Sequence, residues 1–384
     1  MGKEADPLKF HLPTHIIFGS GITPLLKDII DEMEASRLFL ITDKGIVKAG
    51  LLEKITSIIG KVDYFDGIEP NPKSETVNKI GALLRQNPLD LIVALGGGSC
   101  LDAGKAAALL ATNQGIIEDY EGKEKYIHDP LPVVAVPTTC GTGSEVTWVA
   151  VITDVQRKFK MSIKGKKMFP AVALVDPDLL TSLPKPVIAS TGLDAFTHAI
   201  EAYTSKAASI ITDNLALKAV KLISSSLTTC YKDIKRAKVS RENLMMGSLM
   251  AGMAFGNSDV GAVHCLAESI GALFDVPHGV ANAIFLPYVM EFNLPACLDK
   301  YAQIAEAFGL REENAQKAAT KLIEEIRSLS RSLNIPFFKR LGIDESQFLK
   351  IAEYSCQNNS NPSNPRPVTN QDYLSILKAA LADS

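Results

Sequence analysis

LDLIVALGGGSCLDAGKAAALLA, residues 89–111, joins an apolar strand-like run, three successive glycines and an alanine-rich helical segment. A strand that is apolar throughout is typical of a parallel sheet with helices on both faces. The glycines let backbone amides approach a pyrophosphate closely, and the following helix presents its positive N-terminal end. The pattern is neither the G-x-G-x-x-G fingerprint nor a P-loop, and a glycine turn can also serve close packing alone. We therefore predict an α/β unit in which Gly97, Gly98 and Ser99 form a candidate nucleotide loop.

The same alternation extends to both sides of this unit. Apolar, β-branched runs alternate with amphipathic segments from residue 10 to residue 180, including THIIFG, RLFLIT, KVDYF and PVVAV. From residue 186 onward helical spacing prevails, without a strand-like run of similar quality. A chain of 384 residues also favours more than one core. We predict a Rossmann-like α/β domain with a parallel sheet over residues 1–184 and an all-α domain over residues 185–384.

A second polar loop, PTTCGTGSEVT at residues 137–147, follows the run PVVAV. It supplies the hydroxyl groups of Thr138, Thr139, Thr142 and Thr147. Open α/β sheets bind ligands at the carboxyl ends of their strands. Because both polar loops fall at that edge, we predict a dinucleotide cleft between them.

Two residues near this cleft each have two interpretations. Asp43, after RLFLIT, is placed to accept hydrogen bonds from an adenosine ribose while repelling the extra phosphate of NADP, which favours NAD. Its spacing also suits a helix cap before KGIVKAG. Lys160, in RKFKMSIKG, is either a partner of phosphate or nicotinamide, or a surface residue of a strand.

Two segments of the helical half contain a candidate metal site. Asp194 and His198 stand four apart in GLDAFTHAIEAY, so both project from one helix face. His264 and His278 lie in AVHCLAESIGALFDVPHGVAN, and both segments are largely apolar. Such a pair is often only a surface pair, but polar groups set in apolar helices are costly unless something pairs them. Three imidazoles and one carboxylate suit Fe(II) or Zn(II), which would act as a Lewis acid on an alcohol or carbonyl oxygen.

The composition excludes several other classes of function. A net charge of −3, with 22% charged residues, does not indicate a nucleic-acid or membrane partner. The N-terminus, MGKEADPLKF, is charged and without a hydrophobic targeting core. Six cysteines occur without a C-x-x-C pair, as expected for reduced thiols. We expect a cytoplasmic protein that acts on a small molecule.

Taken together, GGGSCLDAGKAAA, PTTCGTGSEVT, LVDPDLLTSLP, GLDAFTHAIEAYTS and HCLAESIGALFDVPHGVANAIFLPYVMEFN resemble the iron-containing (group III) alcohol dehydrogenase family. The resemblance covers essentially the whole chain. It implies a dehydroquinate-synthase-like fold, an active site between an NAD-binding and a metal-binding domain, and a homodimer or larger homo-oligomer. It implies that the metal ligands are Asp194, His198, His264 and His278, that substrate contacts are Phe255 and Val260, and that cofactor contacts are Asp43, Asn71, Gly97, Gly98, Ser99, Asp102, Thr138, Thr139, Thr142, Thr147 and Lys160.

One position departs from the family pattern. Many members carry a non-ligand histidine four residues after the first histidine of the second segment, whereas this chain has Glu268. A carboxylate there could relay protons, orient a ligand imidazole or bind a polar substrate group, or could have no catalytic part. Glu268 and His278 are the candidates for a catalytic role. Val149, where some members carry a polar residue, makes the rim of the pocket more apolar.

Our hypothesis is a metal-dependent oxidoreductase that transfers hydride between NAD(H) and a small primary alcohol or its aldehyde. A dehydroquinate-synthase-type lyase would use the same cofactor and metal. That chemistry calls for several cationic groups around its substrate, and the segments that flank the metal candidates are nearly devoid of Lys and Arg. A nucleotide or metal sensor without turnover is the third alternative.

Overall fold

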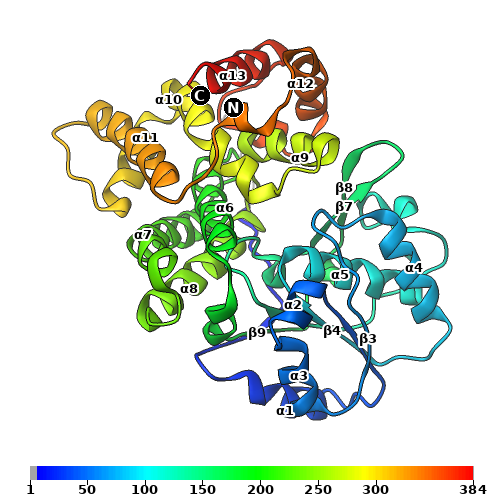
Figure 1. Ribbon diagram of the computed structural model, residues 1–384. Coiled ribbons are helices and arrows are strands. Elements are labelled where there is room, and N and C mark those ends of the chain that lie inside the picture. Colours follow the sequence, from blue (N-terminus) through cyan, green and yellow to red (C-terminus); the bar gives the residue numbers. More distant parts are fainter. Residues whose placement is uncertain (1–6, 384) are drawn as a thin grey trace.

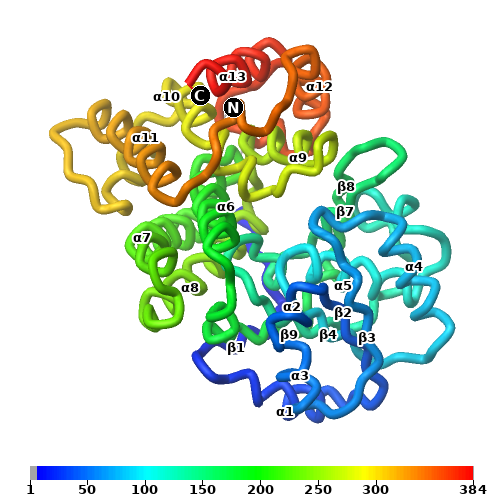
Figure 2. The backbone as a smooth tube through the Cα atoms, in the orientation of Figure 1, coloured from blue at the N-terminus to red at the C-terminus, as the bar shows by residue number. Residues whose placement is uncertain are grey.

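The computed structural model describes residues 7–383. The first six residues, MGKEAD, belong to the segment that we interpreted as lacking a targeting core, and they lie outside the described residues. The chain forms an α/β half, blue to green in Figure 1, and a helical half, green to red. Figure 2, in the same orientation, shows α13 (Asn370–Ala382) at the top of the helical half. The N-terminal segment reaches this half, since the amide of His11 donates to Asn257 Oδ1 at 2.7 Å.

A six-stranded parallel sheet forms the centre of the α/β half, as the alternating runs predicted. Its strand order is β1-β9-β6-β4-β2-β3. The chain leaves β2 toward one edge of the sheet and β4 toward the other, so the loops after β2 and β4 diverge at their carboxyl ends. The strands are β1 (His15–Phe18), β2 (Leu38–Ile41), β3 (Asp63–Phe65), β4 (Leu91–Gly96), β6 (Val133–Pro137) and β9 (Val172–Val175).

Helices cover both faces of this sheet, and β4 illustrates why its sequence is apolar throughout. Ile92 and Ala94 pack in the cluster on the face of α4 (Ser74–Arg85) and α5 (Gly98–Thr112). The intervening residues of β4 face the opposite cluster, which includes side chains from the remaining helices of this half. Those helices are α1 (Leu26–Glu32), α2 (Lys44–Lys48) and α3 (Leu51–Ile59).

The sequence did not predict a second, three-stranded sheet with the order β5-β8-β7. Its strands are β5 (Gly122–Lys123), β7 (Val149–Asp154) and β8 (Phe159–Lys164). The turn between β7 and β8 is too short for a helical crossover, so these strands pair antiparallel and stay outside the main sheet. The resulting hairpin extends toward α9 and α12 of the helical half (Figure 1).

The second half is helical throughout its described residues, as expected. One large core cluster joins its helices and includes Phe196, Phe285 and Tyr301. Within residues 7–383, no helix is long and apolar enough to span a bilayer. The helices before α13 are α6 (Lys185–Thr204), α7 (Ile210–Asp233), α8 (Lys238–Phe255), α9 (Ala262–Phe274), α10 (His278–Phe308), α11 (Ala315–Ser332) and α12 (Phe348–Gln357).

Two glycines allow the second polar loop to contact the helical half directly. Gly143 adopts φ +58°, and a Cβ added to it would overlap with the backbone of Gly252 in α8. A Cβ added to Gly252 would lie 2.7 Å from the Cα of Gly143. The second polar loop, residues 137–147, is called the threonine loop below. It therefore packs on α8 by backbone contact, at the junction of the two halves.

We expect Gly143→Ala to lower the free energy of unfolding by about 3 kcal/mol, because the left-handed backbone costs about 1–2 kcal/mol and overpacking adds a similar amount. Gly50→Ala is the matched control, because Gly50 also has a positive φ, +75°, but nothing within 4 Å of an added Cβ. Urea unfolding of both variants measures the difference. Equal losses would contradict the packing role of Gly143.

Candidate active site at the junction of the two halves

A cavity of about 270 Å³ lies between the α/β half and the helical half. Its walls come from α5, the threonine loop, β8, α6, α8, α9 and the start of α10. Most of the residues predicted from the sequence line it: Asn71, Gly98, Ser99, Asp102, Thr142, Thr147, Lys160, His198, Phe255, Val260, His264, Glu268 and His278. The others do not line it: Asp43, Gly97, Thr138, Thr139 and Asp194.

The predicted metal residues converge although they come from three helices. Ligand atoms of Asp194, His198 and His264 all lie within 4.8 Å of one another, and the three residues are buried. His278, the first residue of α10, places its Nε2 3.7 Å from Asp194 Oδ1. The His264 Nε2 lies 3.9 Å from the same oxygen. The side chains of Asp194 and His278, which are far apart in the sequence, therefore lie next to each other.

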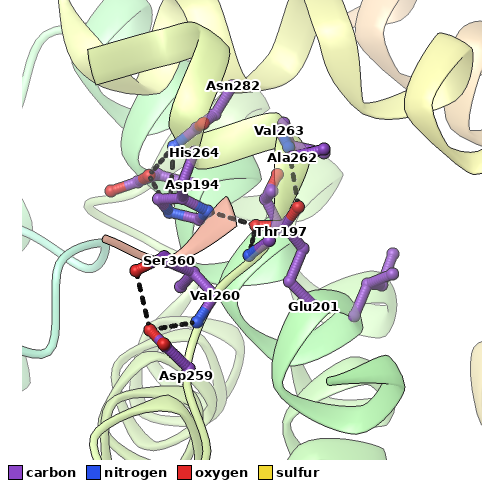
Figure 3. Close-up of polar contacts among 12 residues, drawn as sticks. Asp194, Thr197, Glu201, Asp259, Val260, Ala262, Val263, His264, Asn282 and Ser360 are labelled. Atoms are coloured by element: carbon purple, nitrogen blue, oxygen red, sulfur yellow. Dashed lines mark hydrogen bonds and ion pairs between the residues drawn. The ribbon is translucent and has the colours of Figure 1, made fainter. Parts of the chain in front are cut away.

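Neighbouring side chains hold this cluster from both sides. The ring of Phe255 stacks on His198, with centroids 4.2 Å apart and an interplanar angle of 14°. The Nδ2 amide of Asn282 lies 2.6 Å from Asp194 Oδ1, 3.2 Å from His264 Nε2 and 3.1 Å from His278 Nε2. Figure 3 shows Asn282 facing Asp194 and the His264 ring.

Burial determines the ionisation of the cluster. Desolvation lowers the pKa of His198 and His278 well below the usual value for histidine, so both rings are neutral at physiological pH. Burial also raises the pKa of Asp194, an effect that the Asn282 hydrogen bond and the charge of Lys160 oppose. Neutral imidazoles offer the lone pairs that a metal requires.

These residues fit a divalent metal ion. Nε2 of His264 and Nε2 of His278 lie 3.9 and 3.7 Å from Asp194 Oδ1, so the donor set combines imidazole nitrogen with carboxylate oxygen. Burying such groups together is costly unless a cation shares them. The donor chemistry is that of iron or zinc sites.

The candidate nucleotide loop, Gly97, Gly98 and Ser99, is called the glycine loop below. It faces the threonine loop, and the two loops form a cradle at the edge of the sheet. Gly97 is the N-cap of α5, and Gly96 pairs with Pro137 across β4 and β6. A Cβ on Gly98 would lie only 2.7 Å from Thr142 Oγ1, so only glycine fits this approach. A helix N-terminus behind a glycine turn is a suitable seat for a pyrophosphate.

Thr138, Thr139 and Asp43 lie behind the cradle rather than in the cavity. Thr138 is buried, and its Oγ1 has no hydrogen-bond partner. Thr139 packs where a Cβ on Gly97 would lie 3.1 Å from its Cγ2. Asp43 caps α2 by accepting from the amide of Ile46 at 2.9 Å, as one of the two interpretations predicted. The ribose interpretation of Asp43 stays a prediction.

Asn71 and Asp102 connect structural elements around the cleft. Asn71, at φ +52°, donates to Asp275 Oδ1 at 3.0 Å, which links the two halves. Asp102 accepts from the amide of Val151 at 3.0 Å and from Ser144 Oγ at 2.5 Å. Asp102 thereby fixes the start of β7 to α5.

Lys160 is not a surface strand residue. It is buried on β8, and a Cβ added to Gly271 of α9 would lie 3.1 Å from its Nζ. Burial lowers the pKa of Lys160, while the charges of Glu268 and Asp194 act in the opposite direction. Lys160 therefore lines the cavity, and its contact with phosphate or nicotinamide stays a prediction.

Glu268 lines the cavity but does not orient a ligand imidazole. Its Oε2 accepts from Asn358 Nδ2 at 2.5 Å. The Nδ1 of His264 instead faces Glu201 Oε2 at 2.6 Å. Of the alternatives considered for Glu268, proton relay, contact with a polar substrate group and the absence of a catalytic part remain.

Sequence reasoning missed Glu201. It lies three residues after His198 and seven after Asp194, a spacing that places all three on one helix face. That i, i+4, i+7 pattern was the available signal.

Lys105 and Glu145 were missed as well. Lys105 is fully buried beneath the threonine loop. Its Nζ donates to the carbonyl oxygens of Ser144, at 3.1 Å, and Val149, and lies 3.1 Å from Asp102 Oδ1. Glu145 is buried in the same loop, and desolvation raises its pKa to about 7. In the sequence both looked like ordinary exposed charges.

Comparisons with known proteins agree with this geometry. A family model described as iron-containing alcohol dehydrogenase matches residues 13–177, and the C-terminal model of the Fe-containing alcohol dehydrogenase family matches residues 188–381. The chain belongs to the iron-containing alcohol dehydrogenase family. Like that family, it is a metal-dependent oxidoreductase. The lyase and the sensor are not favoured.

Individual relatives match over nearly their full length. Alcohol dehydrogenase 4 of Saccharomyces cerevisiae is 37% identical over 97% of this chain and 98% of its own. The NAD-dependent methanol dehydrogenase of Bacillus methanolicus is 34% identical over 97% and 99%, respectively. The crystal structure of a 1,3-propanediol oxidoreductase superposes with a TM-score of 0.94, at 37% identity over 97% of this chain and all of that one.

We expect Lys105→Met in this dehydrogenase to weaken NADH binding about tenfold, because carbonyl groups of the threonine loop lose their buried donor at a cost of about 1–3 kcal/mol. NADH fluorescence titration measures the dissociation constant. Lys321→Met, at an exposed lysine of α11, is the control and should bind NADH normally. An unchanged dissociation constant in Lys105→Met would contradict the tethering role.

Glu145 generates a pH dependence of stability. The pKa of Glu145 is about 7 in the folded protein, whereas the ordinary value for glutamate is 4.5. Between these values the unfolded state binds fewer protons, so the free energy of unfolding falls as pH rises, by about 3 kcal/mol from this group. Glu145→Gln should flatten the curve between pH 5 and 7 in urea unfolding of the metal-free protein. If the free energy of unfolding changes with pH equally in the variant and the parent, this role of Glu145 is refuted.

Proposed function

We propose that the chain interconverts short primary alcohols and their aldehydes with NAD(H) at the cavity between its halves. Asp194, His198, His264 and His278 hold the metal. The convergence of these side chains from three helices, with the first three of them buried, is the observation that carries the proposal. When bound, iron supplies a Lewis acid for the substrate oxygen, and NAD accepts the hydride.

The α/β half binds the cofactor in this proposal. Gly97, Gly98 and Ser99 receive the pyrophosphate at the N-terminus of α5. Thr142 and Thr147 form the opposing wall, and Thr138 and Thr139 support it from behind. Asp43 favours NAD over NADP from the end of β2, while Asn71, Asp102 and Lys160 border the nicotinamide end.

The helical half shapes the substrate pocket. Phe255 and Val260 line the cavity beside His198 and exclude water from the reacting atoms. Glu268, one helical turn beyond His264 and held by Asn358, takes or returns the substrate proton at its carboxylate. A cavity of about 270 Å³ suits a short substrate, as do the relatives named for methanol and 1,3-propanediol.

Three broader features belong to the same proposal. The division into an NAD-binding domain, residues 1–184, and a metal-binding domain, residues 185–384, is supported by the start of α6 at Lys185. Six free cysteines support a reducing compartment such as the cytoplasm. The resemblance to the family supports a homodimer or larger homo-oligomer.

The test replaces a proposed ligand and measures metal and turnover together. His278→Ala should weaken metal binding by more than about 100-fold, since even neighbours of ligands contribute 10- to 100-fold. Elemental analysis of anaerobically purified protein gives the metal content. Oxidation of NADH with a panel of C1 to C4 aldehydes gives the activity, which should fall with the metal.

Cys230→Ser is the control, because Cys230 is a buried thiol of α7 outside the cavity. It should keep both metal and turnover. Full activity in metal-free His278→Ala would exclude the ligand assignment. Parent protein that binds NADH and iron but consumes no NADH with any aldehyde would exclude the substrate class.

A further inference from the structure

The buried carboxylate of Glu201 joins the two segments that carry the proposed ligands. It lies on α6, on the helix face of Asp194 and His198, and only 5% of the residue is exposed. Its partners all belong to the beginning of α9, some 60 residues further along the chain. A buried carboxylate without compensation would be costly, so its contacts reveal what it stabilises.

Both carboxylate oxygens accept hydrogen bonds from the same short segment. Oε2 accepts from the amide of Gly261 at 2.9 Å and faces His264 Nδ1 at 2.6 Å. Oε1 accepts from the amide of Val263 at 2.8 Å. Figure 3 shows Glu201 below Val263 and beside the His264 ring. Gly261 is the N-cap of α9 and has no capping side chain, so Glu201 caps this helix from α6.

Counting donors assigns the tautomer of His264. Two backbone amides already donate to the carboxylate, which is acceptor-only in its ionised form, so the short contact requires a proton on Nδ1. The Asn282 Nδ2 amide lies 3.2 Å from Nε2, and an amide donor at that position requires a lone pair on Nε2, so the single N–H of the neutral ring is on Nδ1. That Nε2 is the atom 3.9 Å from Asp194 Oδ1.

We propose that Glu201 is a positioning residue that sets the tautomer and ring orientation of His264 while it fixes the first turn of α9 to α6. One carboxylate thus fixes the proposed ligand of α9 in position relative to the proposed ligands of α6. This inference rests on the proposed assignment of His264 as a ligand. Glu268 does not perform this task, because its hydrogen bond goes to Asn358.

The isosteric variant Glu201→Gln tests the proposal with zinc alone as the probe. The amide has one acceptor oxygen and an NH₂ donor, so it no longer accepts from all three N–H groups. Zinc affinity, measured by chelator competition, should fall about 10- to 100-fold. Glu291→Gln is the control, because Glu291 forms an ion pair with Arg327 at the surface and should bind zinc like the parent.

His264→Ala separates this inference from the proposed function. If His264→Ala binds zinc as tightly as the parent, the ligand assignment fails, and Glu201 has no ligand to position. If His264→Ala loses zinc but Glu201→Gln does not, the assignment stands and the inference about Glu201 is overturned. Loss in both supports it.

A measurement of the His264 tautomer in the parent protein tests the inference even if Glu201→Gln does not fold. In metal-free parent protein labelled with ¹⁵N-histidine, the His264 signal, identified by its loss in His264→Asn, should report protonated Nδ1 and bare Nε2. Protonated Nε2 would overturn the proposal. In a folded Glu201→Gln protein the Nδ1 proton should be lost or shared, whereas an unchanged tautomer would mean that Glu201 serves only the helix cap.

Discussion

The burial of a carboxylate and imidazoles within apolar helices is the constraint around which the helical half is organised. Asp194, His198 and His264 are each at most 4% exposed. Such groups destabilise a fold unless charge and hydrogen bonds compensate them. Compensation comes from Asn282, from Glu201 and, in the proposed function, from the metal. Stability and chemistry therefore depend on the same few atoms.

The second constraint is that neither half alone encloses the cavity, because residues of both halves line it. The threonine loop touches α8 through Gly143 and Gly252, Asn71 reaches Asp275, and Asn359 of the C-terminal loop donates to Ser162 of β8 at 3.3 Å. Asn71 and Ser162 also line the cavity. The position of the proposed nicotinamide end relative to the metal residues thus depends on packing between the halves.

Much of this arrangement could be predicted from the sequence, because the spacing of residues along the chain indicates which faces of a strand or helix are buried. The apolar run of β4 indicated a strand covered on both faces, and the spacing of Asp194 and His198 indicated one helix face. The hairpin β7–β8 was missed because its alternation resembles that of any strand, and only the short turn between its strands reveals where it pairs. Glu201 and Lys105 were missed because a charged residue on a helix normally faces water. Only the tertiary packing shows that these two are enclosed.

The enclosure of Lys105 has a consequence for how the dehydrogenase responds to its surroundings. Exposed ion pairs weaken as salt accumulates, because mobile ions screen them within about 10 Å at 0.1 M. The ammonium of Lys105 is sealed beneath the loop that it holds, with Asp102 and backbone carbonyls as its partners. Dissolved ions cannot reach the ammonium itself, so this wall of the cleft keeps its shape at ionic strengths that dissociate the pairs on the surface.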